Sequence, residues 1–253
     1  MVWVESSSAS FRARHDEADA EDAARILRGL EQLRGELARV FPRTVERELT
    51  VVMHSSTASL SLANPLLGLG WFATAPAARR YVTGWAGKEE LHVLGPRALE
   101  QRASNVPGSR EMLERSAAAL YARRVVIENN RDLGERMTPA RVTRELRWAW
   151  LLEGGARWFG GQTEHARPAI ARRLHEGRRP SFPPGLRDAP LLGGTVVDLL
   201  AREQGVRAAA EFVCHLHPQG ARPALANAFD GRALVHTEGA WRSHLARLAG
   251  DRR

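Results

Sequence analysis

The sequence predicts an α+β fold, in which a small mixed sheet with one helix is followed by a mainly helical half. Two observations support this prediction. Alternating and β-branched runs, which are typical of strands, occur only in the first hundred residues. Beyond residue 108, apolar residues recur with the spacing of amphipathic helices. We therefore expect an N-terminal α/β sheet subdomain at residues 1–108 and a helical subdomain at residues 109–253.

The N-terminal half has three kinds of segment. Strands are expected at Val2-Trp3-Val4 and 11–14, as a hairpin or a pair of strands, and at 49–54 and 90–94. A helix is expected from about Asp19 to Phe41, because its apolar residues have helical spacing and acidic residues are enriched at its start. The stretch from Ser55 to Gly87 is rich in Gly, Pro and Ala, and we expect irregular structure there with one short helix.

The C-terminal half is expected to contain five helices. The first is expected at residues 109–128, and the second starts at Thr138-Pro139 and carries Glu153. The other three are expected at residues 195–204, 206–216 and 238–248. Glycine and proline recur between residues 160 and 194, which predicts a long loop or short helices.

The charge pattern bears on the class of partner. The formal net charge is +8, but the basic residues are almost all arginine, with Lys88 the single lysine. This skew, with heavy Ala, Gly and Leu usage, is typical of a GC-rich genome. The arginines are scattered among acidic residues, so no nucleic acid is expected as a partner, and a basic nucleic-acid-associated protein is kept only as a further alternative.

Two features bear on the compartment. No window approaches the roughly 18 to 20 apolar residues of a membrane span, and the first residues lack a signal-peptide pattern, so a cytoplasmic protein is expected. Cys214 is the single cysteine, which excludes an intrachain disulfide and a cysteine-based zinc knuckle.

Glu153 is the residue around which a functional interpretation is built. An apolar stripe through Val142, Leu146 and Ala149 reaches Glu153 at its next position, which predicts a carboxylate on the buried face of a helix. A buried carboxylate needs a cation, a metal or a hydrogen-bond donor opposite it.

The arrangement around Glu153 resembles a known family. The second of two adjacent helices carries Trp-x-x-Glu-Gly-x-Ala at 150–156, and the preceding sheet ends in Leu91-His92-Val93-Leu94. This resembles the gluzincin (thermolysin-like) metallopeptidases, and more closely the bacterial peptidase-MA-like proteins, over nearly the whole chain. The resemblance implies a zincin-like fold, in which a His-Glu-x-x-His helix supplies two zinc ligands and a general base, and Glu153 takes the third ligand position.

The sequence departs from this family at the metal site. His-Glu-x-x-His is absent, and matching the motif to residues 120–124 puts Leu120 and Arg124 at the ligand positions and Tyr121 at the base. A shift by one residue gives Tyr121, Ala122 and Val125 instead. In either register both histidines and the base are absent, so we expect no bound zinc or other cofactor and no catalytic residue. The degenerate site comprises Leu120, Tyr121, Arg124 and Glu153.

Arg124 then offers one explanation for a buried Glu153. Its guanidinium could fill the metal position and form a charge-assisted pair with Glu153. The alternative is that Glu153 bonds backbone amides or pairs with Arg157 on its own helix.

The resemblance implies a non-catalytic function. We expect a catalytically inactive peptidase homologue that binds or scaffolds a peptide or protein, because relatives hold substrate backbone on an edge strand. That strand is expected at Glu90, Leu91, His92, Val93 and Leu94. The alternative function is an active zinc-dependent peptidase or hydrolase with displaced ligands such as His215, His217 or His236.

Overall fold

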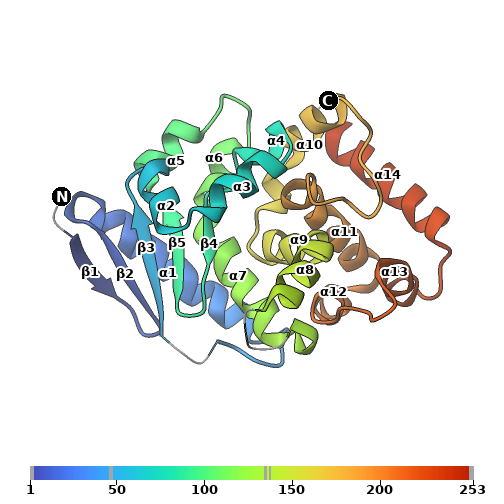
Figure 1. The fold of residues 1–253 in the computed structure, drawn as a ribbon, viewed down its shortest axis with the longest axis horizontal. Coiled ribbons are helices and arrows are strands. Elements are labelled where there is room, and N and C mark those ends of the chain that lie inside the picture. Colours follow the sequence, from blue (N-terminus) through green and yellow to red (C-terminus); the bar gives the residue numbers. More distant parts are fainter. Residues whose placement is uncertain (1–2, 46–47, 134–135, 137, 251–253) are drawn as a thin grey trace.

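A computed structural model describes residues 3–45, 48–133, 136 and 138–250. Within these residues the chain combines one mixed five-stranded sheet with fourteen α-helices (Figure 1). The predicted mixed sheet in the first half and the mainly helical second half are therefore confirmed. None of the helices in the described residues is long and apolar enough to cross a lipid bilayer.

The sheet has the strand order β1-β2-β3-β5-β4. Its strands are β1 (Trp3–Ser7), β2 (Phe11–Asp16), β3 (Leu49–His54), β4 (Gly84–Ala86) and β5 (Glu90–Leu94). β2, β3 and β5 are parallel, whereas β1 and β4 run antiparallel to their neighbours at the two edges. The expected hairpin, apart from Val2, which lies outside the described residues, and the strands at 49–54 and 90–94 are confirmed. β4 is an additional strand in the stretch predicted as irregular.

The two faces of the sheet differ in polarity because side chains alternate along a strand. One face carries buried residues such as Phe11, Val51 and Leu91, and it packs against α1 (Ala20–Leu37) and α7 (Ser116–Asn129). The opposite face carries the exposed pairs of Arg14 with Glu5 and Glu90, at 2.9 and 3.5 Å. The main core of this half therefore lies between the sheet and helices α1 and α7, while α2 covers part of the opposite face.

Three helices occupy most of the stretch predicted as irregular. They are α2 (Thr57–Ala63), α3 (Leu66–Ala73) and α4 (Pro76–Arg79). Ser56 and Ser59 form a reciprocal capping box at the start of α2. Pro76 starts α4 with a preset backbone angle. The expectation of a single short helix here was wrong, because the start signals at Ser56 and Pro76 outweigh the high glycine and proline content at α2 and α4.

Two of the expected long helices are each broken into two. The first breaks at Arg115 between α6 (Ser109–Glu114) and α7, and the second at Trp148 between α8 (Pro139–Arg147) and α9 (Ala149–Phe159). The remaining helices are α5 (Pro96–Arg102), α10 (Arg167–His175), α11 (Ala189–Gln204), α12 (Val206–Val213), α13 (Ala221–Ala228) and α14 (Leu234–Gly250).

The break at Trp148 changes which residues are buried. Val142 and Leu146 are 44% and 53% exposed, because α8 turns away from the core before α9 begins. The predicted continuous apolar stripe through both residues was therefore wrong. In α9 itself, Ala149, Trp150 and Ala156 of the predicted stripe are buried, whereas the Glu153 side chain is only partly buried, with 27% exposed.

Small residues let α9 pack closely between α7 and α11 (Figure 1). A methyl group added at Gly154 would lie 2.5 Å from the backbone carbon of Gly193 in α11. On the other side, a methyl group added at Gly160 would lie 2.5 Å from Cα of Ala119 in α7. These contacts fix the register of α9 against α7, and so decide which side chain of α7 faces Glu153.

Candidate functional site

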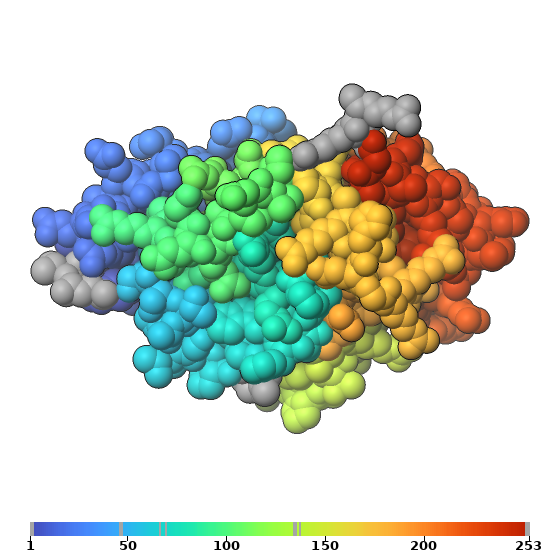
Figure 2. Space-filling model, turned by 90° about the horizontal axis from the view of Figure 1, so that it is seen from above, coloured from blue at the N-terminus to red at the C-terminus, as the bar shows by residue number. Residues whose placement is uncertain are grey.

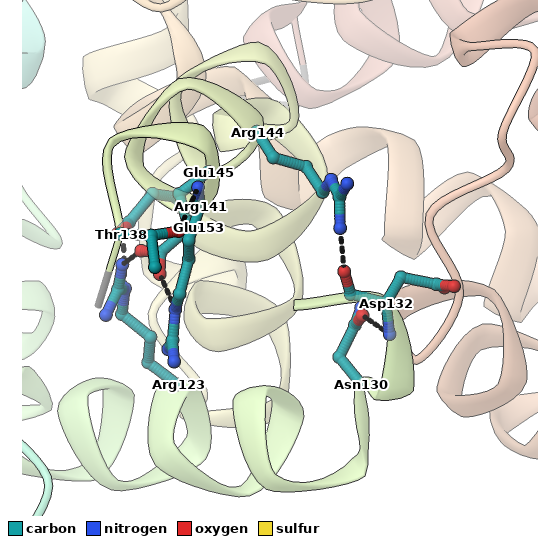
Figure 3. Close-up of polar contacts among 8 residues, drawn as sticks. All are labelled: Arg123, Asn130, Asp132, Thr138, Arg141, Arg144, Glu145 and Glu153. Carbon is teal, nitrogen blue, oxygen red and sulfur yellow. Dashed lines mark hydrogen bonds and ion pairs between the residues drawn. The ribbon is translucent and has the colours of Figure 1, made fainter. Parts of the chain in front are cut away.

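Glu153 of α9 faces an arginine of α7, but the arginine is Arg123. The Nε atom of Arg123 donates to Oε1 of Glu153 at 2.7 Å (Figure 3). The Nη2 atom of the same guanidinium donates to Oε2 of Glu145 in α8 at 3.1 Å. One guanidinium therefore bridges two carboxylates that come from two different helices.

Arg141 extends this contact into a chain of four charges. Its Nε donates to Oε1 of Glu145 at 2.8 Å, one helical turn away on α8. Thr138 caps α8 by accepting a hydrogen bond from the backbone N–H of Arg141. The order Arg141, Glu145, Arg123, Glu153 alternates cation and anion, and their side chains are between 11% and 27% exposed. We call these four residues the charge chain.

The pKa values agree with a paired, partly buried site. Burial lowers the pKa of the Arg123 guanidinium, but the charges of Glu153 and Glu145 outweigh burial and raise it above its usual range. Burial also lowers the pKa of the neighbouring Arg157, an effect that the Glu153 charge only partly offsets. Arg157 instead donates to the backbone oxygen of Tyr81 at 2.9 Å and to Oε1 of Gln162 at 2.6 Å.

The predicted pair between Arg124 and Glu153 was wrong. Arg124 bonds Glu128 on its own helix at 2.6 Å. Tyr121, placed at the base position by the motif match, is buried on another side of α7 with its ring 5.1 Å from that of Phe11, and burial raises its pKa to about 12. Successive side chains of a helix point about 100° apart. Matching the motif one residue too late along α7 therefore selected Arg124 instead of Arg123 as the side chain facing Glu153.

The positions of α7 that face Glu153 come one residue before the first predicted register and two residues before the shifted one. Ala119, Leu120 and Arg123 line a crevice with Glu153, together with Thr83 and with Gly84 of β4. Leu120 is thus at the site, as predicted, although it corresponds there to the general base rather than to a ligand. The prediction that the two histidines of the motif are missing still holds for these positions, because they are Ala119, Leu120 and Arg123.

Zinc does not fit the side chains of this crevice. Glu153 is its one carboxylate, and that carboxylate already accepts a hydrogen bond from Arg123, whose positive charge would repel a metal ion. The crevice measures about 20 Å³, which is room for about one water molecule. Within the described residues, no three His, Cys, Asp or Glu side chains lie together as a potential metal site, so His215, His217 and His236 are not brought into one.

The strand predicted as the peptide-binding edge lies inside the sheet. Residues 90–94 form β5, but β4 pairs with it antiparallel and β3 pairs with it on the other side. The edge next to the crevice is therefore β4. The sequence did not indicate this strand, because it is only three residues long and begins with a glycine.

The free edge of β4 can be assigned residue by residue. Gly87 N donates to Glu90 O and Leu94 N donates to Thr83 O, at 2.7 and 3.0 Å. Because alternate residues of an antiparallel strand bond the same neighbour, Thr83, Trp85 and Gly87 face β5. Gly84 and Ala86 consequently direct their backbone N–H and C=O groups away from the sheet.

A second polar cluster joins β3, β5 and β4 on the sheet face opposite α1 and α7, where α2 covers part of it. His54 and His92 approach to 3.0 Å between Nε2 and Nδ1, and the Nε2 of His92 lies 3.0 Å from Oε2 of Glu90. With Glu90 as acceptor, His92 donates through Nε2 and accepts a hydrogen bond from His54. The indole of Trp85 stacks on the His92 ring, with centroids 3.9 Å apart.

Burial keeps both imidazoles of this cluster neutral. It lowers the pKa of His54 to about 4, with a further contribution from the neighbouring His92. Burial also lowers the pKa of His92, although the hydrogen bond and charge of Glu90 oppose the shift. Sequence analysis missed this cluster, because only the parallel register of β3 and β5 brings His54 beside His92.

No protein-family model, curated protein or solved structure matches this chain. The gluzincin relationship therefore stays a prediction from the residues quoted above.

Proposed function

We propose that the protein is a catalytically inactive, gluzincin-like peptidase homologue that binds an extended peptide or protein segment by adding it as a strand to β4. The main observation behind this proposal is the free edge of β4. Strand addition needs a sheet edge whose N–H and C=O groups point outward, and Gly84 and Ala86 supply two such positions. Within the described residues, no other strand pairs with this edge.

The charge chain supports the non-catalytic part of the proposal. Peptide hydrolysis by a zincin needs a metal and a general base, whereas the corresponding positions hold Ala119, Leu120 and Arg123. Two hydroxyls that line the crevice are already hydrogen-bonded to each other, since Thr83 Oγ1 donates to Ser116 Oγ at 2.7 Å in a buried pair. An added strand would pass these groups without meeting an activated nucleophile.

Binding can be tested with a variant that alters only the free edge. Ala86→Pro removes the outward N–H of Ala86 but leaves the bonds from β4 to β5, and Ala86→Val keeps the N–H as a matched control. The probe is a peptide selected on the wild-type chain from a random phage-displayed library, and its affinity is measured by calorimetry.

We expect Ala86→Pro to weaken the peptide about tenfold or more, because one backbone hydrogen bond is lost and the proline ring meets the added strand. Ala86→Val should bind within about twofold of wild type. Equal binding by both variants, or a library that yields no binder, would contradict strand addition at β4.

A further inference from the structure

Helices α2 and α3 present apolar side chains to solvent. Leu62 of α2 is 84% exposed and Phe72 of α3 is 81% exposed, the two highest values among the large hydrophobic residues of the described chain. Figure 1 shows both helices in front of the sheet, and in Figure 2 the cyan and turquoise residues of this region lie together along the lower edge.

The segment that contains these helices has no charge. No Asp, Glu, Lys, Arg or His occurs between His54 and Arg79, although 26% of the chain is charged. Single exposed apolar residues are ordinary on protein surfaces. Here, however, Leu62 and Phe72 lie on consecutive helices that have no charged side chain to keep them solvated.

Arginines without carboxylate partners border this segment. Arg80 donates to the backbone oxygen of Arg102 at 2.8 Å, and Arg102 donates back to the oxygens of Arg80 and Arg79 at 3.0 and 2.9 Å. Within the described part of the chain, none of the three forms an ion pair with a carboxylate. Burial and the neighbouring Arg80 charge lower the pKa of Arg102, so the cations repel one another.

These arginines lie directly against the aromatic residues of α3. The guanidinium carbon of Arg79 lies 5.9 Å from the centroid of the Phe72 ring, and that of Arg102 lies 5.6 Å from the Trp71 ring. The aromatic and the cationic groups therefore lie together, and α2, which packs against α3, adds Leu62 next to them. We call this the α2–α3 surface: Leu62, Trp71, Phe72, Arg79, Arg80 and Arg102.

We propose that the α2–α3 surface attaches the protein peripherally to an anionic lipid bilayer. Exposed Leu and Phe beside arginines, with a partly buried Trp, is the composition of segments that lie in the interface of a membrane. Lipid phosphates complement the exposed Arg79 and the partly exposed Arg80 and Arg102, while the acyl boundary accepts Leu62 and Phe72. The net charge of +8 attracts the whole molecule to a negative surface. This attachment is independent of strand addition at β4.

Vesicle co-sedimentation of the full chain tests the attachment. The probes are large unilamellar vesicles of phosphatidylcholine alone and of phosphatidylcholine mixed equally with phosphatidylglycerol, in 0.1 M NaCl. We expect at least tenfold stronger partitioning to the anionic vesicles, and we expect 0.5 M NaCl to reverse most of it. The salt titration needs no variant, so it stays informative if a substitution impairs folding.

Two pairs of variants locate the surface. Leu62→Ser with Phe72→Ser should reduce partitioning at least tenfold, whereas Val235→Ser, on a residue 69% exposed on α14, should change it less than twofold. Arg79→Gln should reduce it about fivefold, the effect of one cation at an anionic surface. Arg28→Gln, on an exposed arginine of α1, is the matched charge control.

Three results would overturn the proposal. The first is no partitioning to either kind of vesicle. The second is that Val235→Ser or Arg28→Gln weakens binding as much as its test variant does. The third is that the double serine variant leaves vesicle binding unchanged but converts a dimer to a monomer in light scattering, which would assign the surface to a second copy of the chain.

Discussion

Replacing Arg123 by alanine is the sharpest test of how the charge chain stabilises the fold. The substitution leaves Glu153 without its bonded cation and leaves Glu145 with Arg141. Removing one partner from a fully buried pair typically costs about 3 to 5 kcal/mol, whereas a fully exposed pair contributes about 1 kcal/mol or less. Arg123 is 19% exposed and Glu153 is 27% exposed, so we expect a loss of about 2 to 4 kcal/mol.

Urea denaturation followed by tryptophan fluorescence measures this loss. Arg25→Ala is the matched control, because its side chain is 64% exposed and its partner is Asp22 on the same helix, and it should cost less than about 0.5 kcal/mol. Arg123→Met combined with Glu153→Leu should cost less than Arg123→Ala alone, because no unpaired carboxylate is left behind at position 153.

Two results would refute this reasoning. A loss below about 1 kcal/mol for Arg123→Ala would mean that water solvates the pair as it does at the surface. A double variant that is less stable than the single one would mean that the ion pair itself, and not the avoidance of an unpaired charge, stabilises the helix packing.

Three further predictions concern the metal, the pH dependence and the helix packing. Protein incubated with zinc and then desalted should retain less than about a tenth of an equivalent by elemental analysis, and one equivalent would contradict our assignment of the crevice. The pKa of His54 is about 4 in the folded chain against an ordinary 6.5. Above pH 6.5 the imidazole is neutral in both states and the stability is complete, whereas stability is lost as the pH falls toward 4, because the unfolded chain takes up this proton first. This loss amounts to at most about 3 kcal/mol and should be absent from His54→Gln in urea titrations at pH 7 and pH 4.5. Gly154→Ala should cost about 3 kcal/mol through its collision with Gly193, whereas Gly29→Ala, with open space around it, should be neutral or stabilising by up to about 1 kcal/mol; equal effects of the two glycine substitutions would contradict close packing of α9.

The elements that sequence analysis predicted well are those with a strong local pattern. β3 and β5 have β-branched and alternating residues, and α1 has a regular apolar stripe, so each could be located within a few residues. The breaks at Arg115 and Trp148 could not be predicted in this way, because neither residue is a glycine or a proline.

The site itself was predicted only in part. The sequence analysis offered Arg124 as the partner of Glu153, with backbone amides or Arg157 as the alternative, whereas the partner is the adjacent Arg123. The close approach of Gly160 to Ala119 decides this, and such a tertiary contact has no signature along the chain. The partner Glu145 was missed for a similar reason, although its four-residue spacing from Arg141 is a recognisable helical ion pair.

The alternation of charge in the chain from Arg141 to Glu153 has a consequence for the field around the crevice. Two cations and two anions in sequence sum to zero, and the potential of such an arrangement decays over a shorter distance than that of a single ion. A segment that reaches β4 would therefore meet little net field from the charge chain, and the positive charge of the crevice wall would come from Arg157, which donates to the neutral oxygens of Tyr81 and Gln162. Discrimination among peptides would then depend on backbone hydrogen bonding, on steric fit and on this single cation, so acidic side chains should be favoured over basic ones.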